Sequence, residues 1–364
     1  MYFIEDPEVT LDEEGHDFPE GAEKKGGIEW SINVVGLGDD GVKYWIDMGM
    51  LGYPHMNVFG TDSGGADIVH LAVRTETGKV VQSRQTVYKI ADFPNTPRAK
   101  IEQFYPRGTL TIKRSEHQVA VDCGDGHYVL KDDKTWHFSV EDKEKGIKVE
   151  FVHYGVGFPM WYSEKGKLRA STPHSIGGGY FWAGISEGTI TFEGRTVKIK
   201  GKGSRQRYFA ADYCSEEVGG WHDWNWFHFD EMHGCVEEMK VSKYKVSSLY
   251  LLDEKQYFSD NSFDIEHHEW AYLPLLGAFI PTHYKVTLET EGGVLEMTGD
   301  VVGSFVWVKA EVPHCPFAML DWDNLQGTFT YKDGRKRALT NGIGGNMIRL
   351  WRPYPNFIPE ITAI

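Results

Sequence analysis

The chain is short of basic residues. Lys and Arg number 38 against 53 Asp and Glu, so the formal net charge is −15 over 364 residues. A surface with this excess of negative charge repels the phosphates of nucleic acids and of anionic lipid headgroups. We therefore expect neither nucleic acid nor a membrane as a partner. An uncharged, hydrophobic small molecule fits this balance better than a polyanionic ligand.

Cysteine and long apolar runs are also scarce. No C-x-x-C pair occurs among the four cysteines, which argues against a zinc ribbon and a redox dithiol and favours free, mostly buried thiols. Residues 1–7 lack the basic and apolar regions of a signal peptide. No stretch approaches the roughly 18 apolar residues of a membrane-spanning helix. We expect a cytoplasmic protein.

Helical periodicity is missing as well. No apolar pattern with a period of 3.6 residues persists over three turns. Short segments with strand character follow one another instead, and turn residues separate them. Segments 28–35 and 43–50 predict one hairpin, and segments 67–74 and 80–89 predict a second. Ile147–Tyr154 alternates between apolar and polar residues. This pattern predicts an all-β protein, a sandwich or a barrel.

The number of expected strands, about 20, is too large for one small barrel. We therefore expect two antiparallel β-barrels in tandem. Glycines at 201, 203, 219 and 220 suggest a boundary between them. The expected organisation is an acidic N-terminal arm at 1–26, a first barrel at 27–203 and a second barrel at 204–364.

What the chain has in abundance is glycine, with 41 residues, and aromatic side chains, with 14% of the composition. Residues 221–231 form the densest aromatic segment. In a strand, alternate residues share a face. One face would hold Asp223, Asn225 and Phe227. The other would carry the two histidines and two indoles of the segment: His222, Trp224, Trp226 and His228. Inside a barrel, this second face would form an aromatic pocket with titratable groups.

Two neighbouring regions add candidate binding residues. Arg205 and Tyr208 lie just upstream, where a guanidinium group would hold a substrate oxygen or pair with a carboxylate. Trp161, Tyr180 and Trp182 form another aromatic concentration around a run of three glycines. Those glycines lack the Lys-Ser/Thr and the helix of a phosphate-binding loop. For residues 221–231 the alternative interpretation is a barrel core wall with hydrogen-bonded histidines, and for Arg205 it is a surface ion pair.

Other catalytic motifs are absent. There is no G-x-S-x-G and no H-E-x-x-H motif. Adjacent His267 and His268 would point to opposite faces of a strand, so they are a poor chelating pair. We expect no bound metal and no cofactor. A pair of glycosidase carboxylates stays possible, because such a pair need not be close in sequence.

Several of these segments resemble the lipocalin-like hydroxyneurosporene synthase (carotenoid 1,2-hydratase) superfamily, to which kievitone hydratase and the lipocalin-like Diels–Alderases are related. The resemblance spans roughly residues 28–230. It rests on Glu29-Trp30, 158–166, 179–194, 197–201 and 221–226. The family signature places a histidine after the aspartate. Here Trp224 stands at that position, and a histidine, His222, precedes the aspartate instead.

The resemblance implies two lipocalin-like barrels and a hydratase, isomerase or cyclase without a cofactor. The substrate would be a hydrophobic unsaturated molecule of secondary metabolism, such as a terpenoid or a phenolic. We expect Asp223 to act as the acid, with His222 or His228 as its partner. The residues expected to line the pocket or orient the substrate are Trp224, Trp226, Trp161, Tyr180, Trp182, Arg205 and Tyr208.

Two other functional classes stay open. A non-catalytic carrier of a hydrophobic ligand predicts an apolar pocket with no titratable group at its base. A carbohydrate-active enzyme predicts exposed tryptophans and an open groove with two facing carboxylates. Substrate identity and oligomeric state are not visible in the sequence.

Overall fold

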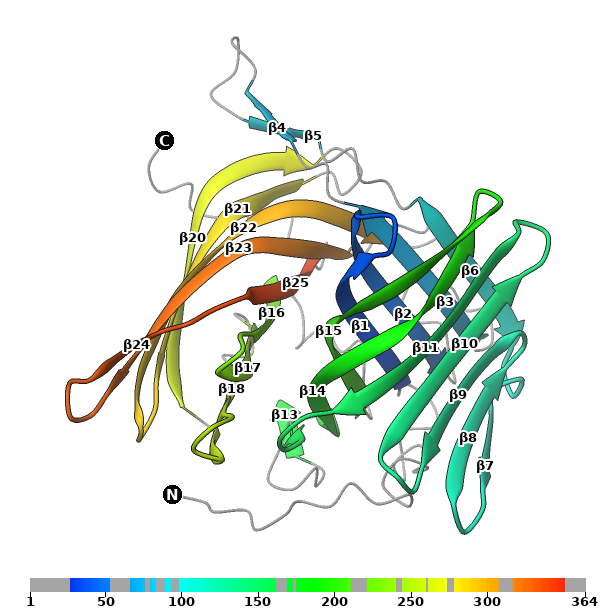
Figure 1. Ribbon diagram of the computed structural model, residues 1–364, viewed down its shortest axis with the longest axis horizontal. Helices are drawn as coiled ribbons and strands as arrows, with labels where there is room; N and C mark the ends of the chain where they lie inside the picture. Colours follow the sequence, from blue (N-terminus) through cyan, green and yellow to red (C-terminus); the bar gives the residue numbers. More distant parts are fainter. Residues whose placement is uncertain are drawn as a thin grey trace. The chain divides into compact units, whose positions relative to one another are not determined.

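The computed structural model describes residues 27–52, 66–75, 79–82, 89–92, 98–161, 169–172, 175–210, 221–239, 244–259, 261–273, 278–307 and 317–350. Within these ranges, all regular secondary structure consists of β-strands (Figure 1), so the all-β prediction is confirmed. They contain no helix with the length and apolarity needed to cross a membrane. The expected acidic arm at 1–26 lies outside the described residues.

The strands belong to two compact units. The first unit holds β1 (Gly27–Gly38), β2 (Lys43–Gly52), β3 (Ala66–Thr75), β6 (Ala99–Pro106), β7 (Thr111–Arg114), β8 (Gln118–Cys123), β9 (Gly126–Lys131), β10 (Thr135–Asp142), β11 (Ile147–Gly155), β12 (Met160–Trp161), β13 (Arg169–Thr172), β14 (Ser175–Phe192) and β15 (Arg195–Ala210). The second unit holds β4 (Lys79–Gln82), β5 (Lys89–Asp92), β16 (Trp221–His228), β17 (Met232–Met239), β18 (Tyr244–Leu251), β19 (Gln256–Ser259), β20 (Ser262–Leu273), β21 (Ala278–Glu289), β22 (Gly293–Trp307), β23 (Phe317–Tyr331), β24 (Lys336–Ala338) and β25 (Gly342–Leu350).

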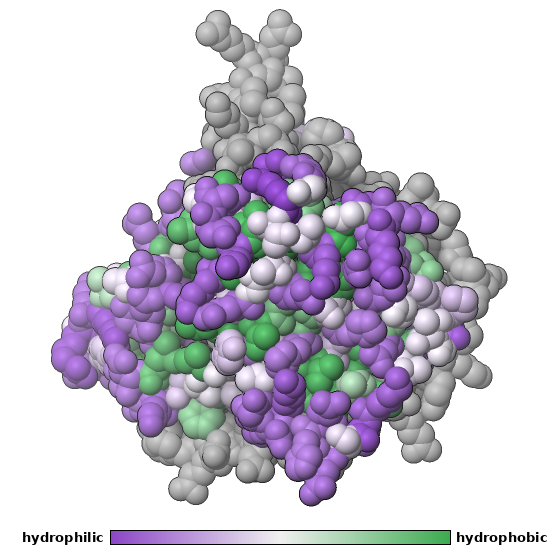
Figure 2. Space-filling model, turned by 45° about the vertical axis from the view of Figure 1, so that its right-hand side comes forward, coloured by the Kyte–Doolittle hydropathy of each residue, from purple (hydrophilic) through white to green (hydrophobic). Residues whose placement is uncertain are grey.

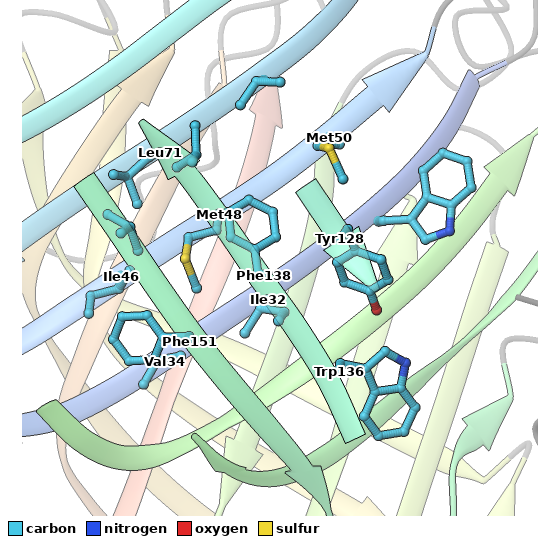
Figure 3. Packing of buried hydrophobic residues seen from close by; sticks show 14 of the residues in the cluster. Ile32, Val34, Ile46, Met48, Met50, Leu71, Tyr128, Trp136, Phe138 and Phe151 are labelled. Carbon is cyan, nitrogen blue, oxygen red and sulfur yellow. The ribbon is translucent and has the colours of Figure 1, made fainter. Parts of the chain in front are cut away.

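The first unit is one antiparallel sheet with the order β6-β3-β2-β1-β15-β14-β11-β10-β9-β8-β7. The sheet curls around a single apolar core to which strands from both of its ends contribute, as Figure 3 shows for Met48, Leu71 and Phe138. Its far ends meet where the Asp125 amide donates a hydrogen bond to the Tyr105 hydroxyl at 3.3 Å. The predicted alternation of Ile147–Tyr154 is confirmed, because Ile147, Val149 and Phe151 are buried in the core.

The two longest strands of this sheet, β14 and β15, form a hairpin with a two-residue turn. Glu193 and Gly194 both have positive φ angles, of 49° and 73°. That pair of angles is the geometry of a type I′ turn, whose twist matches that of the flanking strands. β15 continues without a break through Gly203 and Ser204, and its residues 199–210 pair with β1. It therefore carries the first unit's sheet beyond the 203/204 boundary that the glycines suggested.

The segment between β3 and β6 has an unexpected course. The predicted hairpin of 67–74 with 80–89 is wrong. β3 pairs with β6, and the Arg98 amide donates to the Val73 carbonyl at 2.8 Å. The intervening β4 and β5 pair with each other and join the sheet of the second unit, where β5 runs parallel to β20 (Figure 1). Partner choice between strands depends on contacts made far along the chain, which a local turn signal does not contain.

The second unit is one curled sheet with the order β19-β18-β17-β16-β25-β23-β22-β21-β20-β5-β4. Its core is a separate apolar cluster that includes Phe227, Tyr284, Trp322 and Phe329. The side chain of Lys245 on β18 donates to the Phe263 carbonyl of β20 at 3.2 Å. β18 and β20, which belong to opposite halves of the sheet order, therefore lie close together.

The visible surface is mostly polar, with apolar patches between the charged side chains (Figure 2). Among the described residues, the exposed large apolar side chains are Leu37, Phe104, Tyr154, Val156 and Ile185, all of the first unit. Cys123 and Cys235 are free and buried, as expected. Burial raises the pKa of the Cys123 thiol to about 12. Cys214 and Cys315 lie outside the described residues.

Close strand contact requires glycine at position 203. A Cβ atom there would overlap the Asn33 carbonyl oxygen on β1. We expect Gly203→Ala to lower the free energy of unfolding by about 1–3 kcal/mol, because backbone must shift to accept the methyl group. Lys202→Ala, one residue earlier, is the control and should change it by less than about 0.5 kcal/mol. Urea unfolding followed by far-UV circular dichroism measures both, and equal stabilities would contradict the close packing of β1 on β15.

Candidate active site

The two faces of β16 have different surroundings. Phe227, together with Phe229 just after the strand, lies in the core cluster of the second unit. Asp223 and Asn225 lie on the same face as Phe227, by the alternation of a strand, and both are fully buried. The interior face is therefore the one with Asp223, whereas the sequence pattern favoured the face with the indoles as the pocket wall. Burial in the interior favours the face with Phe227 and Phe229 over the face with the indoles, because the phenylalanine rings have no polar atom that needs a hydrogen-bond partner.

The Asp223 carboxylate accepts hydrogen bonds at both oxygens. Oδ1 accepts from the side-chain amide of Asn225 at 2.8 Å and from that of Asn346. Asn346 lies on β25 directly opposite Asn225 and also donates to its Oδ1 atom at 2.6 Å. Amide groups that donate to a buried carboxylate oxygen stabilise its ionised form. Asp223 is thus built to carry a negative charge inside the unit.

The third partner of Asp223 is His267 on β20. The His267 Nε2 atom lies 2.5 Å from Asp223 Oδ2. β16 and β20 are separated by four strands in the sheet order, so this bond crosses the interior of the curled sheet. His267 retains 8% side-chain exposure, whereas Asp223 has none. The imidazole is therefore the member of the pair that is nearer to solvent.

His267 and its neighbour His268 point to opposite faces of β20, as the sequence predicts. The His268 side chain is 47% exposed and lies 3.3 Å from Glu266. Among the described residues, no group of three or more His, Cys, Asp or Glu side chains is arranged to hold a metal ion.

Three aromatic residues surround the Asp223–His267 pair. The ring of Tyr284 packs on His267 at 5.2 Å and on Trp322 at 4.6 Å, and Trp270 lies 5.8 Å from His267. The Tyr284 hydroxyl donates to Asn346 Oδ1 at 3.4 Å. Burial, and then the negative charge of Asp223, raise the pKa of Tyr284 well above its usual value, so it stays a phenol. The indole N–H of Trp322 is buried and has no hydrogen-bond partner among the described residues.

The remaining residues expected on β16 lie on its other face. Trp224, Trp226 and His228 are buried there. His228 packs on Trp226 at 5.3 Å and on His233 at 5.9 Å, and His233 packs on Tyr250. Alternation along the strand separates His228 from Asp223, so His267 takes the place that we expected His222 or His228 to fill. The side chain of His222 lies outside the described residues.

The other expected binding residues belong to the first unit. Tyr180, Trp182 and Arg205 face its interior, where the Arg205 guanidinium lies 4.4 Å from the Tyr180 ring. Tyr208 is half-buried on the opposite face of β15, and its carbonyl oxygen accepts from Arg207 at 2.8 Å. The side chain of Trp161 lies outside the described residues. The structure thus distributes the candidate residues over two interiors, one in each unit.

Sequence reasoning missed Asn346, Tyr284 and Trp322. The available signal was weak: a polar side chain at the centre of an otherwise apolar or glycine-rich strand, as at Asn346 in β25. His267 was considered only as a metal ligand. Its approach to Asp223 joins positions 44 residues apart, and no local spacing predicts such a contact.

Comparisons with known proteins identify the fold. No protein-family model and no curated protein matches this chain by sequence. Among solved structures, an AttH candidate from Nitrosomonas europaea superimposes with a TM-score of 0.62 and 14% identity, over 94% of this chain and 96% of its own. Kievitone hydratase from Nectria haematococca matches with a TM-score of 0.58 and 7% identity, over 92% and 93% of the two chains. CghA matches with 0.51 and 8%, over 89% and 88%.

These likenesses establish the class of fold. The protein has two tandem lipocalin-like antiparallel barrels, as predicted. Identities of 7–14% carry no residue roles from those proteins to this one.

The first unit also buries a histidine that is held neutral. His153 Nε2 donates to the Trp182 carbonyl at 3.2 Å, and Nδ1 accepts from the Ser186 hydroxyl at 2.9 Å. Burial lowers the pKa of His153 to about 4 from its ordinary 6.5. The unfolded chain therefore binds a proton first as the pH falls, so the contribution of His153 to stability is complete above about pH 6.5 and is lost progressively towards pH 4.

We expect His153→Gln to weaken this acid sensitivity. The shift corresponds to about 3 kcal/mol across the window from pH 6.5 to 4, and the variant should lose less stability than the wild type over that range. His117→Gln is the control, because the His117 side chain is 73% exposed. Urea unfolding at several pH values measures the effect. Identical pH profiles for wild type and His153→Gln would show that His153 is not held neutral.

Proposed function

We propose that the protein is an acid–base enzyme that hydrates, isomerises or cyclises a hydrophobic unsaturated small molecule. The observation that carries the proposal is the buried hydrogen bond between Asp223 and His267, at 2.5 Å, inside the second unit. Buried polar groups are costly unless they are satisfied, and a carboxylate paired with an imidazole is a common arrangement for proton transfer. The fold shared with kievitone hydratase is compatible with such chemistry.

In this proposal His267 moves the proton and Asp223 positions it. Both Asp223 oxygens accept hydrogen bonds, which disfavours the role of acid that the sequence suggested for this residue. The Asp223 carboxylate orients the imidazole through Nε2 and stabilises the imidazolium that forms. His267 then donates a proton to a substrate double bond or carbonyl through Nδ1. A water molecule, or a group of the substrate itself, captures the resulting cation and gives up a proton to His267 Nδ1, which restores the imidazolium.

The aromatic surroundings support a cationic intermediate. The rings of Tyr284 and Trp270 contact His267, Tyr284 in a T-shaped arrangement at 81° and Trp270 at a tilt of 58°, and Trp322 packs on Tyr284. The negative faces of aromatic rings stabilise a nearby positive charge by about 1–2 kcal/mol in a desolvated site. The Trp322 N–H supplies a donor for a substrate oxygen. None of these steps needs a cofactor.

The two alternative functions receive less support. A simple carrier has no need of a titratable pair in its interior, yet Asp223 and His267 are there. A carbohydrate-active enzyme needs exposed aromatic platforms, and no described tryptophan side chain is exposed. The open groove on the outer face of the first unit contains Asp39 and Glu187 but no tryptophan.

We expect that incubation with mixed terpenoids and phenolics will convert one of them, with a mass gain of one water molecule or an isomer of unchanged mass. Asp223→Asn and His267→Gln should each lower kcat by about 10²- to 10⁴-fold, the usual contribution of a general acid or base. His268→Gln, which changes the adjacent exposed imidazole, is the matched control and should keep wild-type activity. Liquid chromatography with mass spectrometry follows the products.

Two outcomes would reject this proposal. A ligand that is retained without alteration would indicate a carrier. Turnover that survives both Asp223→Asn and His267→Gln would place the chemistry elsewhere in the protein.

A further inference from the structure

The carboxylate of Asp223 has another carboxylate beside it. Asp223 on β16 lies directly opposite Glu238 on β17 in the strand register. Opposite residues on neighbouring strands project from the same face of a sheet, so Glu238 faces the same interior. The Glu238 side chain retains 9% exposure, and Lys245 on β18 lies 3.5 Å from its carboxylate. Ionised Asp223 thus lies near a second negative charge, and its hydrogen-bond donors offset that repulsion.

One of those donors, Asn346 on β25, connects three side chains. Its Nδ2 atom donates to Asp223 Oδ1 and to Asn225 Oδ1, and its own Oδ1 atom accepts from the Tyr284 hydroxyl at 3.4 Å. A side-chain amide has two N–H donors and one carbonyl acceptor. Asn346 uses all of them although it is fully buried.

The phenol of Tyr284 determines which way this amide points. Because the hydroxyl donates to the carbonyl oxygen of Asn346, the NH₂ group faces Asp223. The reverse orientation would place a carbonyl oxygen against a carboxylate, and two acceptors repel each other. The ring of the same tyrosine contacts His267 at 5.2 Å. Tyr284 therefore contacts both the amide that binds Asp223 and the imidazole that binds it.

The two oxygens of Asp223 have different partners. Oδ1 accepts from the amides of Asn225 and Asn346, whereas Oδ2 lies 2.5 Å from His267 Nε2. Each donor to a carboxylate stabilises its charged form and so makes it less basic. The amide at position 346 therefore controls how strongly Oδ2 attracts the proton of the imidazole.

We propose that Asn346 is a positioning residue for the Asp223–His267 pair and that Tyr284 orients it. The amide keeps Asp223 an ionised acceptor in spite of Glu238, so the mobile proton belongs to His267. Asn346 contacts no reacting atom and acts through Asp223. The inference rests on the proposed function, in which His267 transfers the proton.

Nuclear magnetic resonance of the full-length protein, labelled with ¹⁵N-histidine and without any ligand, tests this role. The Hε2 resonance of His267, identified by its absence in His267→Gln, moves downfield as its hydrogen bond to Asp223 strengthens. Asn346→Leu should move it downfield, because Asp223 becomes more basic. Asn346→Asp, of nearly the same size as the wild type, should move it upfield, because two adjacent carboxyl groups share one proton and less charge faces His267.

Proton sharing also gives Asn346→Asp a characteristic stability profile. The shared proton raises a carboxyl pKa in the folded protein above its value of about 4 in the unfolded chain. Relative to the wild type, this variant should therefore be most stable below about pH 4 and should lose stability as the pH rises. Asn346→Leu, which adds no carboxyl group, should not show this dependence. Urea unfolding at several pH values measures both variants.

Asn341→Asp is the matched control. The exposed Asn341 also donates its amide to an aspartate, Asp230, at 2.5 Å, but water surrounds that pair. The same substitution there should leave the His267 resonance and the pH profile of stability unchanged. If Asn346→Leu does not fold, as judged by circular dichroism, Tyr284→Phe replaces it. That variant keeps the ring, releases the amide, and should move the His267 resonance downfield by a smaller amount.

The inference is overturned if the Asn346 variants leave the His267 resonance in place or move it in the same direction. It is equally overturned if Asn346→Asp loses the same stability at every pH. These measurements use no substrate, so their outcome is separate from that of the proposed function. Failure of the proposed function would appear instead as turnover that survives both Asp223→Asn and His267→Gln.

Discussion

The second unit is organised around one buried carboxylate. Asp223 has no solvent contact, so its charge depends on hydrogen bonds from β16 itself, from β25 and from β20. Those donors are far apart in sequence and meet only because the sheet curls until its two halves face each other. The same curvature that buries the apolar core therefore brings together an acid–base pair. Loss of any one donor would leave a buried charge less satisfied, a change that typically costs about 1–3 kcal/mol.

The first unit buries guanidinium groups, where the second unit buries a carboxylate. Its interior carries positive charge, at Arg205 and Arg207, and aromatic ring faces lie against both guanidinium groups. Elsewhere in this unit, the buried Arg74 pairs with the Asp47 carboxylate.

Much of the fold could be predicted from the sequence, because strand alternation is a local property. Ile147–Tyr154 and Tyr180–Trp182 both show the expected alternation, and Asp223, Asn225 and Phe227 share one face. Which distant strands pair with each other could not be predicted. The turn at 76–78 suggested a local hairpin, yet β3 pairs with β6 and β4–β5 join the other unit. The side chain that pairs with Asp223 could not be predicted either, because four strands lie between β16 and the strand of His267 in the sheet order.

The amino-acid sequence by itself determined the all-β class, the excess of negative charge, the candidate aspartate and the opposite orientations of His267 and His268. Each of these follows from composition or from the two-residue period of a strand. The tertiary structure decided which face of β16 is the interior, which histidine pairs with Asp223, and that Arg205 belongs to a separate aromatic interior. These outcomes depend on how each sheet curls and on which strands become neighbours, and both are set by packing summed over the whole unit.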